Sequence, residues 1–345
     1  MQKVKKIPEL IIDNFKLYDF VYKNISSSTL IVADDHNFPT LHLSDPISNK
    51  QNLILVKDCL KREIYEIKKN KEYNKIIAIG GCTALDFGRA CAKPQDQIIL
   101  IPSILSTSCI SVNRSIIYFD SEYESIVTPT PAKVFISSQL LLEGDTQVIS
   151  KWTHSGFGDL FANISAAIDF QFHQHGENIF KREMRIVELL RHIAPESMDA
   201  IEWAQKGIGK FDENLMEELA KLLHHSSVYT ILREDTKLSS AGEHDLYYSM
   251  MKLHKYSREN PTHGELVTVG TLLTAKILGE KSKNNSLFLQ LKDACKKIGI
   301  PINYNELKEI NVTKDHILQG MANLRNKRSF LNIFFQERLL DECYG

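Results

Sequence analysis

The sequence lacks the features that would assign the chain to a membrane or to a nucleic acid. No apolar run approaches the roughly 20 residues that a membrane-spanning helix needs. Lys and Arg total 42 and Asp and Glu total 43, so the formal net charge is only −1, and no excess of one sign favours nucleic acid or an anionic membrane as a partner. The basic N-terminal residues are not followed by the apolar segment of a signal peptide. A soluble, cytoplasmic protein is therefore expected.

Cysteine is scarce and irregularly spaced. The chain has six cysteines and no C-x-x-C pair. They are Cys59, Cys82, Cys91, Cys109, Cys295 and Cys343. This pattern predicts reduced thiols and excludes both a disulfide framework and a thiolate zinc site.

The length of 345 residues suggests two domains. Short, almost wholly apolar strands are expected at 29–33, 52–56, 75–79 and 98–102, with helices expected at 58–71 and 83–92. Apolar strands that alternate with helices indicate a parallel, Rossmann-like sheet covered on both faces. A further strand pair is expected from Ser115–Phe119 and Lys133–Ser137.

After residue 149 the periodicity becomes that of helices, with almost no strand candidates. The expected helices cover 149–175, 180–194, 214–232, 241–256, 263–279, 286–298 and 314–324. The sequence thus predicts an α/β nucleotide-binding domain at 1–148 and an all-helical metal- and substrate-binding domain at 149–345.

A glycine turn follows the third expected strand. Gly80 and Gly81 lack Cβ atoms and open a helix, so backbone N–H groups at the helix start would point at a pyrophosphate. The GxGxxG fingerprint is absent, and a plain tight turn is the alternative interpretation. Asp34 ends an earlier strand and would hold a ribose diol while repelling a 2′-phosphate, which favours NAD over NADP. Asp34 would otherwise only solvate a loop.

Two histidines and an aspartate form a candidate metal site. His244 and His263 lie on either side of a break that contains Pro261, and Asp159 ends the motif Ser-Gly-Phe-Gly-Asp. Two imidazoles and one carboxylate leave a fourth position open, as in catalytic zinc sites. The alternatives are satisfied core histidines and a helix-capping aspartate. Glu243 directly precedes His244, and Glu265 follows His263 by two residues. Both glutamates would orient the histidine rings.

Five motifs follow one another along the chain: Gly-Gly-Cys after a strand, a serine-rich loop after Pro102, Gly-Phe-Gly-Asp, Gly-Glu-His and His-Gly-Glu. Taken in this order, they resemble those of the iron-containing alcohol dehydrogenase and dehydroquinate synthase superfamily, and most closely those of the sn-glycerol-1-phosphate dehydrogenases. The resemblance covers about residues 29–335. It implies a dehydroquinate synthase-like fold, a homodimer, and one divalent metal on Asp159, His244 and His263. Zinc is preferred, with iron or nickel as alternatives.

The resemblance also implies NAD or NADP as cofactor. The residues that would bind it are Asp34, Gly80, Gly81, Cys82, Asp86, Ser103, Ser106 and Thr107. Ser106 and Thr107 would also face the substrate and act in catalysis with the three metal ligands. Cys82 departs from the third glycine that is common in the family. The loop from Ser106 to Ser111 contains no acid, whereas glycerol-1-phosphate and glycerol dehydrogenases carry an aspartate there.

These residues predict a metal-dependent NAD(P)H oxidoreductase of a small phosphorylated ketone, with dihydroxyacetone phosphate and sn-glycerol 1-phosphate as the first candidate pair. One alternative is a sugar-phosphate cyclase or lyase that uses NAD transiently, and another is a binding protein that has lost turnover. Ser106, Thr107 or His254 would relay a proton. Candidates for contact with the substrate phosphate are Lys237, Asn113, Arg114 and Lys133, although residues of these types more often lie on the surface without such a role.

Overall fold

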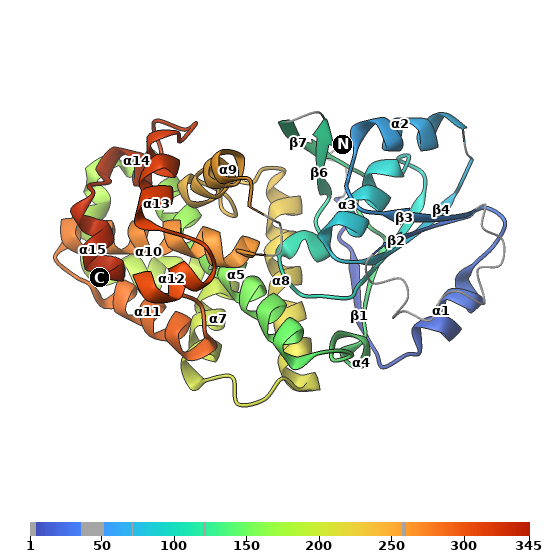
Figure 1. Ribbon diagram of the computed structural model, residues 1–345, viewed down its shortest axis with the longest axis horizontal. Coiled ribbons are helices and arrows are strands. Elements are labelled where there is room, and N and C mark those ends of the chain that lie inside the picture. The colour runs from blue at the N-terminus through green and yellow to red at the C-terminus, as the bar shows by residue number, and fades with distance from the viewer. Residues whose placement is uncertain (1–4, 36–51, 71, 120–121, 257–259) are drawn as a thin grey trace. The chain divides into compact units, whose positions relative to one another are not determined.

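The computed structural model describes residues 5–35, 52–70, 72–119, 122–256 and 260–345. The chain forms two compact units (Figure 1). Unit 1 comprises Met1–Ile149 and Phe211–Leu232, and unit 2 comprises Ser150–Lys210 and Arg233–Gly345.

Unit 1 is built on a six-stranded, fully parallel sheet in the order β1-β8-β5-β4-β2-β3. The strands are β1 Glu9–Ile12, β2 Thr29–Asp34, β3 Leu53–Val56, β4 Lys75–Gly80, β5 Gln97–Pro102 and β8 Lys133–Ile136. The central strands are apolar almost throughout because both faces are covered. The predicted parallel sheet is confirmed.

Successive side chains of a strand point to opposite faces of the sheet, so the apolar strands present an apolar surface on each face. Helices cover both faces. On one face, α1 (Leu17–Asn24) packs Leu17 and Val21 against Ile31 and Ile77. On the other face, α3 (Cys82–Cys91) lies close enough that Gly88 meets Ala78. The remaining helices of the unit are α2 Lys61–Asn70, α4 Ser138–Leu141 and α8 Glu213–Arg233. The sheet is thus covered on both faces, and in such folds ligands bind at the carboxyl ends of the strands.

The expected pairing of Ser115–Phe119 with Lys133–Ser137 is wrong. Both segments contain strands, but β6 (Arg114–Phe119) pairs antiparallel with β7 (Glu122–Val127). β8 instead joins the main sheet between β1 and β5. The sequence Glu-Tyr-Glu-Ser-Ile-Val of β7 is too polar to be recognised as a strand. Pairing β6 with β7, the next strand along the chain, also closes a shorter loop than pairing β6 with β8, which favours the local hairpin.

In the part of unit 2 that the structure describes, the regular elements are all helices, as predicted. Its elements are α5 Thr146–His175, the 3₁₀ segment η3 Gly176–Arg185, α6 Ile186–Ile193, α7 Pro195–Lys206, α9 Gly242–His254, α10 His263–Ser282, α11 Ser286–Ile298, α12 Tyr304–Glu309, α13 Lys314–Ala322, α14 Phe330–Phe334 and α15 Arg338–Tyr344. Buried residues occupy most of α5 and α10, so these two helices form the centre of the unit.

The division at residue 148 that the sequence suggests differs from these units in one element. It assigns every later helix to the second domain, whereas α8 lies with the α/β unit. The Ser227 hydroxyl on α8 donates a hydrogen bond to the carbonyl of Ser108, and His224 Nδ1 lies 3.0 Å from Ser111 Oγ. These polar contacts hold α8 against the loop that follows β5.

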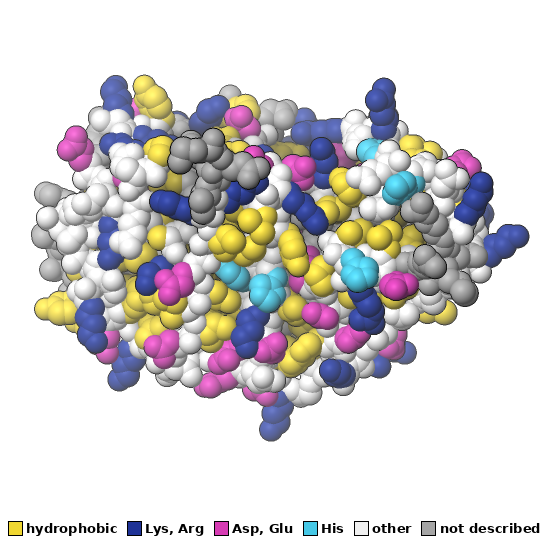
Figure 2. All heavy atoms as spheres, turned by 180° about the vertical axis from the view of Figure 1, so that it is seen from behind, with side chains coloured by type: hydrophobic (Ala, Val, Ile, Leu, Met, Phe, Trp, Pro, Cys, Tyr) yellow, Lys and Arg dark blue, Asp and Glu magenta, His cyan; other side chains and the backbone are white. Residues whose placement is uncertain are grey.

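The surface carries charges of both signs. Figure 2 shows Lys and Arg side chains interspersed with Asp and Glu over one face of the molecule, in keeping with the net charge of −1. Among the described residues, no helix is long and apolar enough to cross a membrane.

Candidate metal centre and cofactor turn

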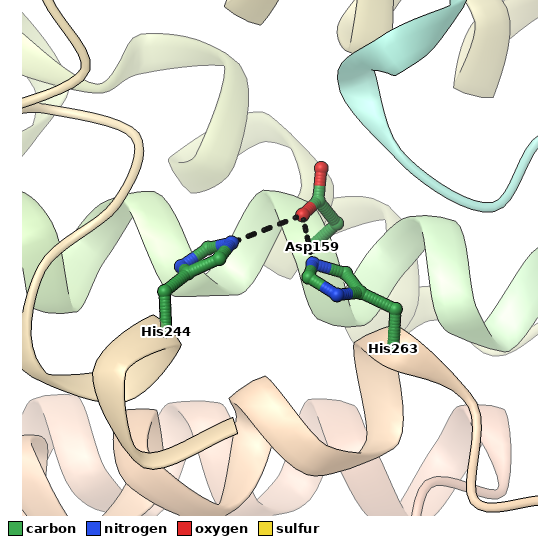
Figure 3. A group of neighbouring side chains, drawn as sticks. All are labelled: Asp159, His244 and His263. Carbon is green, nitrogen blue, oxygen red and sulfur yellow. Dashed lines mark hydrogen bonds and ion pairs between the residues drawn. The ribbon is translucent and has the colours of Figure 1, made fainter. Parts of the chain in front are cut away.

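Asp159, His244 and His263 come together in unit 2 from three helices (Figure 3). His263 Nε2 lies 3.0 Å from Asp159 Oδ1, and His244 Nε2 lies 3.7 Å from the same oxygen. One potential ligand atom from each residue lies within 4.8 Å of the other two. Asp159 and His244 are buried, and His263 is partly exposed. The three residues predicted from widely separated motifs are therefore neighbours.

Two glycines bring the helices close enough for this meeting. A Cβ atom on Gly264 would lie 2.0 Å from the carbonyl oxygen of Ser155, and one on Gly158 would lie 2.4 Å from the carbonyl oxygen of Gly264. The Gly264 N–H also donates a 3.0 Å hydrogen bond to Ser155 Oγ. The backbones of α5 and α10 thus touch beside Asp159 and His263, which explains the glycines in both motifs.

His263 is the first residue of α10, and its position is set by a capping box. The Thr262 hydroxyl accepts from the Glu265 N–H at 3.3 Å, and the Glu265 carboxylate accepts from the Thr262 N–H at 2.7 Å. This arrangement satisfies the free N–H groups of a helix start. The prediction that Glu265 orients His263 directly is wrong, because its carboxylate reaches back to Thr262; it fixes the helix start instead.

Glu243 orients His244, as predicted. Its Oε1 lies 2.8 Å from His244 Nδ1 and also accepts from the Ala241 N–H at 2.8 Å. Its Oε2 accepts a 2.7 Å hydrogen bond from Ser165 Oγ, which lies 3.1 Å from Thr274 Oγ1. A carboxylate beside Nδ1 favours the tautomer that carries its proton there, so Nε2 is left as a metal ligand facing Asp159.

Burial and mutual hydrogen bonds shift the pKa values of the three residues. Burial opposes ionisation of Asp159, but hydrogen bonds with His244 and His263 outweigh it, so the pKa of Asp159 lies well below its ordinary value. Burial likewise opposes the charged form of His244, but hydrogen bonds to Asp159 and Glu243 raise the pKa of His244 to about 9. For His263 burial prevails, and its pKa is lowered. A divalent cation that displaces the proton of His244 would meet an ionised carboxylate and two imidazoles, a ligand set that suits zinc, iron or nickel.

The glycine turn of unit 1 lies at the carboxyl ends of adjacent strands. Asp34 ends β2, Gly80 ends the neighbouring β4, and the Ser103 N–H donates a 3.0 Å hydrogen bond to the Gly80 carbonyl. Gly80 has φ +139°, and a Cβ atom there would lie 2.2 Å from Asp34 Oδ2. This backbone conformation and the closeness of Asp34 both require glycine. The carboxyl edge of a parallel sheet is where such folds bind nucleotides.

Asp34 also touches Gly81. Its Oδ2 accepts a hydrogen bond from the Gly81 N–H, so this amide is engaged within the protein. Cys82 begins α3, so its backbone amide belongs to the helix start. Among the described residues, Ser103 Oγ is buried without a hydrogen-bond partner. The predicted roles of Asp34, Gly81 and Ser103 in cofactor binding stay predictions that this geometry accommodates.

Cys82 and Cys109 form a disulfide, which corrects the prediction that all six cysteines are reduced thiols. Their Cα atoms are 6.0 Å apart, although the residues are 27 positions apart in the sequence. The disulfide joins the glycine turn to the short 3₁₀ helix η2 (Ser108–Ile110) in the serine-rich loop. Cys82 Sγ also lies 3.5 Å from Ser106 Oγ and 3.3 Å from Thr107 Oγ1. The pairing was missed because irregular spacing carries no information about contacts made through the fold.

Asp86 makes contacts that are structural. Its Oδ1 pairs with the fully buried Arg89, and its Oδ2 accepts from the Ile116 N–H at 3.0 Å. Arg89 in turn donates a 2.6 Å hydrogen bond to the Cys109 carbonyl. These contacts support the loop beside the glycine turn. They favour a positioning role for Asp86 over the predicted direct contact with the cofactor.

Three candidates for contact with the substrate phosphate pair with other side chains, and the proton-relay candidate His254 lies away from the metal-ligand candidates. Lys133 lies 3.2 Å from Glu9, Arg114 donates to Ser125, and Lys237 lies 3.6 Å from Asp235. The His254 ring stacks on His316 at the far end of α9. Since it follows His244 by ten residues, it lies about 15 Å along the helix from that ligand. A direct proton relay by His254 is therefore excluded.

The chain is similar to known proteins in sequence and in fold. No family model matches the chain. Glycerol-1-phosphate dehydrogenase (NAD(P)+) of Methanococcus maripaludis strain C7 is 24% identical over 269 residues, which cover 76% of this chain and 75% of that protein. The enzyme of the same name from Archaeoglobus fulgidus is 22% identical over 325 residues, 89% of this chain and 86% of that protein. The resemblance seen in the motifs is confirmed.

The fold is shared with solved dehydrogenases. Glycerol dehydrogenase from Schizosaccharomyces pombe superposes with a TM-score of 0.64 at 16% identity, covering 99% of this chain and 90% of that one. An iron-containing alcohol dehydrogenase from Corynebacterium glutamicum gives a TM-score of 0.64 at 12% identity, covering 100% and 97%. The predicted dehydroquinate synthase-like fold, an α/β unit with a helical unit, is confirmed.

Proposed function

We propose that this chain is a metal-dependent NAD(P)H oxidoreductase that interconverts a small phosphorylated ketone and its alcohol. The observation that carries the proposal is the convergence of Asp159, His244 and His263. Relatives named glycerol-1-phosphate dehydrogenase support dihydroxyacetone phosphate and sn-glycerol 1-phosphate as the first pair to test. These relatives also favour redox chemistry over a cyclase or lyase. We also propose that two copies of this chain form a homodimer.

Asp159, His244 and His263 would hold a divalent ion, zinc in the first instance, which when bound supplies Lewis-acid polarisation of a carbonyl. Asp159 contributes the negative charge, since hydrogen bonds from the two histidines keep it ionised despite its burial. Glu243 holds the ring of His244 with its Nε2 toward Asp159. The capping box fixes the first turn of α10 and with it the backbone of His263.

In unit 1, the turn from Gly80 to Cys82 and the amino end of α3 would bind the pyrophosphate of NAD(P)H, which supplies the hydride. Asp34 would bind the ribose hydroxyls. The hydroxyls of Ser106 and Thr107 are the groups of the acid-free loop that would hold or pass a proton. The part that an aspartate plays in this loop of the glycerol-1-phosphate and glycerol dehydrogenases would then fall to neutral hydroxyls.

NADH oxidation by zinc-loaded protein tests the proposal, with a panel of ketones led by dihydroxyacetone phosphate. We expect oxidation that requires a phosphorylated ketone and falls at least about a thousandfold in His263→Ala, because two protein ligands cannot hold the ion in place. His192→Ala, exposed on α6 of the same unit, is the matched control and should retain full activity. NADH and zinc binding without turnover of any ketone would contradict the oxidoreductase and favour the cyclase.

A further inference from the structure

We propose that Cys82 and Cys109 form a thiol–disulfide exchange site, and that their oxidation to the disulfide weakens NAD(P)H binding. The inference rests on the proposed function, because it needs the glycine turn to be the cofactor site. Cys82 belongs to that turn, and Cys109 belongs to the loop whose Ser106 and Thr107 would face the nicotinamide. Both cysteines fall where the chain departs from the pattern of the family it resembles.

The exposure of the six cysteines separates this pair from the other four. Cys82 and Cys109 are partly exposed. The remaining four cysteines form no disulfide and are buried, with exposed fractions of at most 5%. Burial raises the pKa of Cys91 and of Cys343 to about 12, and it also raises that of Cys295. Thiols that are buried and protonated react slowly, so a small disulfide in solution would react first at Cys82 and Cys109.

The loop is held beside the turn by contacts that do not depend on the disulfide. Arg89 donates to the Cys109 carbonyl at 2.6 Å, Ser227 donates to the carbonyl of Ser108, and the Cys109 N–H donates to Thr107 Oγ1 at 3.0 Å. The two Cα atoms, 6.0 Å apart, are within the usual range for disulfides. The thiols therefore stay adjacent after reduction, and the bond can form and break without refolding of the loop.

The exchange balances with a low-molecular-weight disulfide such as glutathione disulfide. One thiolate attacks a sulfur of the small disulfide, forms a mixed disulfide and releases one small thiol. The second thiolate attacks the protein sulfur of the mixed disulfide, forms the bond between Cys82 and Cys109 and releases the other small thiol. Cys82 is suited to the first attack because it begins α3, where the helix start stabilises a thiolate.

Oxidation would act on the cofactor through the position of the Cys82 side chain. In the disulfide, its sulfur is fixed 3.5 Å from Ser106 Oγ and 3.3 Å from Thr107 Oγ1. It thereby engages two hydroxyls that would otherwise meet the cofactor, and it ties the turn to the loop. Reduction removes this constraint, so that the thiol is able to rotate away from both hydroxyls. We expect the oxidised protein to bind NADH about tenfold more weakly, the loss that accompanies one broken hydrogen bond to a charged group.

The test compares the zinc-loaded full chain after dithiothreitol and after glutathione disulfide. Alkylation under denaturing conditions counts free thiols, and NADH fluorescence titration gives the affinity. Oxidised protein should label at four cysteines and reduced protein at all six. The affinity should fall about tenfold on oxidation and recover with dithiothreitol. In the double variant Cys82→Ser/Cys109→Ser, which can form neither the disulfide nor a mixed disulfide at these two positions, the affinity should be the same after both treatments.

Labelling of six thiols after the oxidant, or equal NADH affinity in the two states, would overturn the inference. A tenfold change that persists in Cys82→Ser/Cys109→Ser would also overturn it, because the effect would then arise elsewhere. If NADH binds in neither state, the proposed function is wrong, and the proposed redox control of cofactor binding is then wrong as well. The thiol count would still report separately whether the pair forms.

Discussion

His244 Nδ1 lies 2.8 Å from Oε1 of Glu243, the residue before it in the chain. Adjacent residues on a helix ordinarily point in different directions, so such a contact is unusual. It arises at the start of α9, where Glu243 is fully buried and is held on its other oxygen by Ser165. The pair sets the orientation of one metal-ligand candidate from within its own motif.

Replacement of Glu243 by Gln should weaken zinc binding about 10- to 100-fold, because the amide no longer fixes the tautomer of His244 with a charged acceptor. Competition with a chromophoric chelator measures the affinity. Glu265→Gln is the matched control. The Glu265 carboxylate bonds to Thr262 in the capping box, and Gln also serves in a capping box. Equal zinc affinity in Glu243→Gln and wild type would remove Glu243 from the site.

Gly264→Ala should separate α5 from α10, because the new methyl group would meet the Ser155 carbonyl at 2.0 Å. We expect a loss of about 1–3 kcal/mol in the free energy of unfolding, as for other overpacked helix contacts. Zinc affinity should also fall, since Asp159 and His263 lie on these two helices. Urea unfolding and the same chelator assay measure the two effects. Gly209→Ala, with open space around its Cα, should change neither.

Glu196→Gln should stabilise the protein at neutral and alkaline pH. Burial raises the pKa of Glu196 to about 7, and among the described residues its Oε2 has no hydrogen-bond partner. Oε1 accepts from Asn163 Nδ2 at 3.3 Å, a contact that Gln would keep.

The sign of the effect follows from proton binding. Between the ordinary carboxyl pKa of 4.5 and the raised value of about 7, the folded protein binds more protons than the unfolded chain. The free energy of unfolding of the wild type therefore falls as pH rises through this window, by at most about 3 kcal/mol. Thermal unfolding should show a gain for Glu196→Gln at about pH 8 and almost none at about pH 4. Glu188→Gln, exposed on α6, should be flat across the range; a uniform gain in both variants would refute the assignment.

Asp34→Asn should change the preference between NADH and NADPH. The amide oxygen can still accept from the Gly81 N–H, but the negative charge beside the turn is gone. Affinity for NADPH should rise about tenfold while that for NADH changes little, because a 2′-phosphate is no longer repelled. Fluorescence titration with both cofactors measures the ratio. An unchanged ratio would place the ribose away from Asp34.

The sequence by itself determined the elements that local pattern encodes. Apolar runs marked β2, β3, β4 and β5, and helical periodicity marked α5, α9, α10 and α11, because burial of a strand or a helix face leaves a period in the chain. The motifs around Asp159, His244 and His263 also marked those three residues, although only as members of separate segments. The polar strand β7 and the short helices α12 and α14 left no such period and were missed.

Only the tertiary structure decided which distant residues meet. Gly158 and Gly264 bring α5 against α10, Glu265 turns back to Thr262, and Cys82 reaches Cys109 across 27 positions. Each outcome depends on how closely two backbones approach and on which buried polar groups find partners. These quantities are properties of packing between segments, and no pattern within a single segment records them.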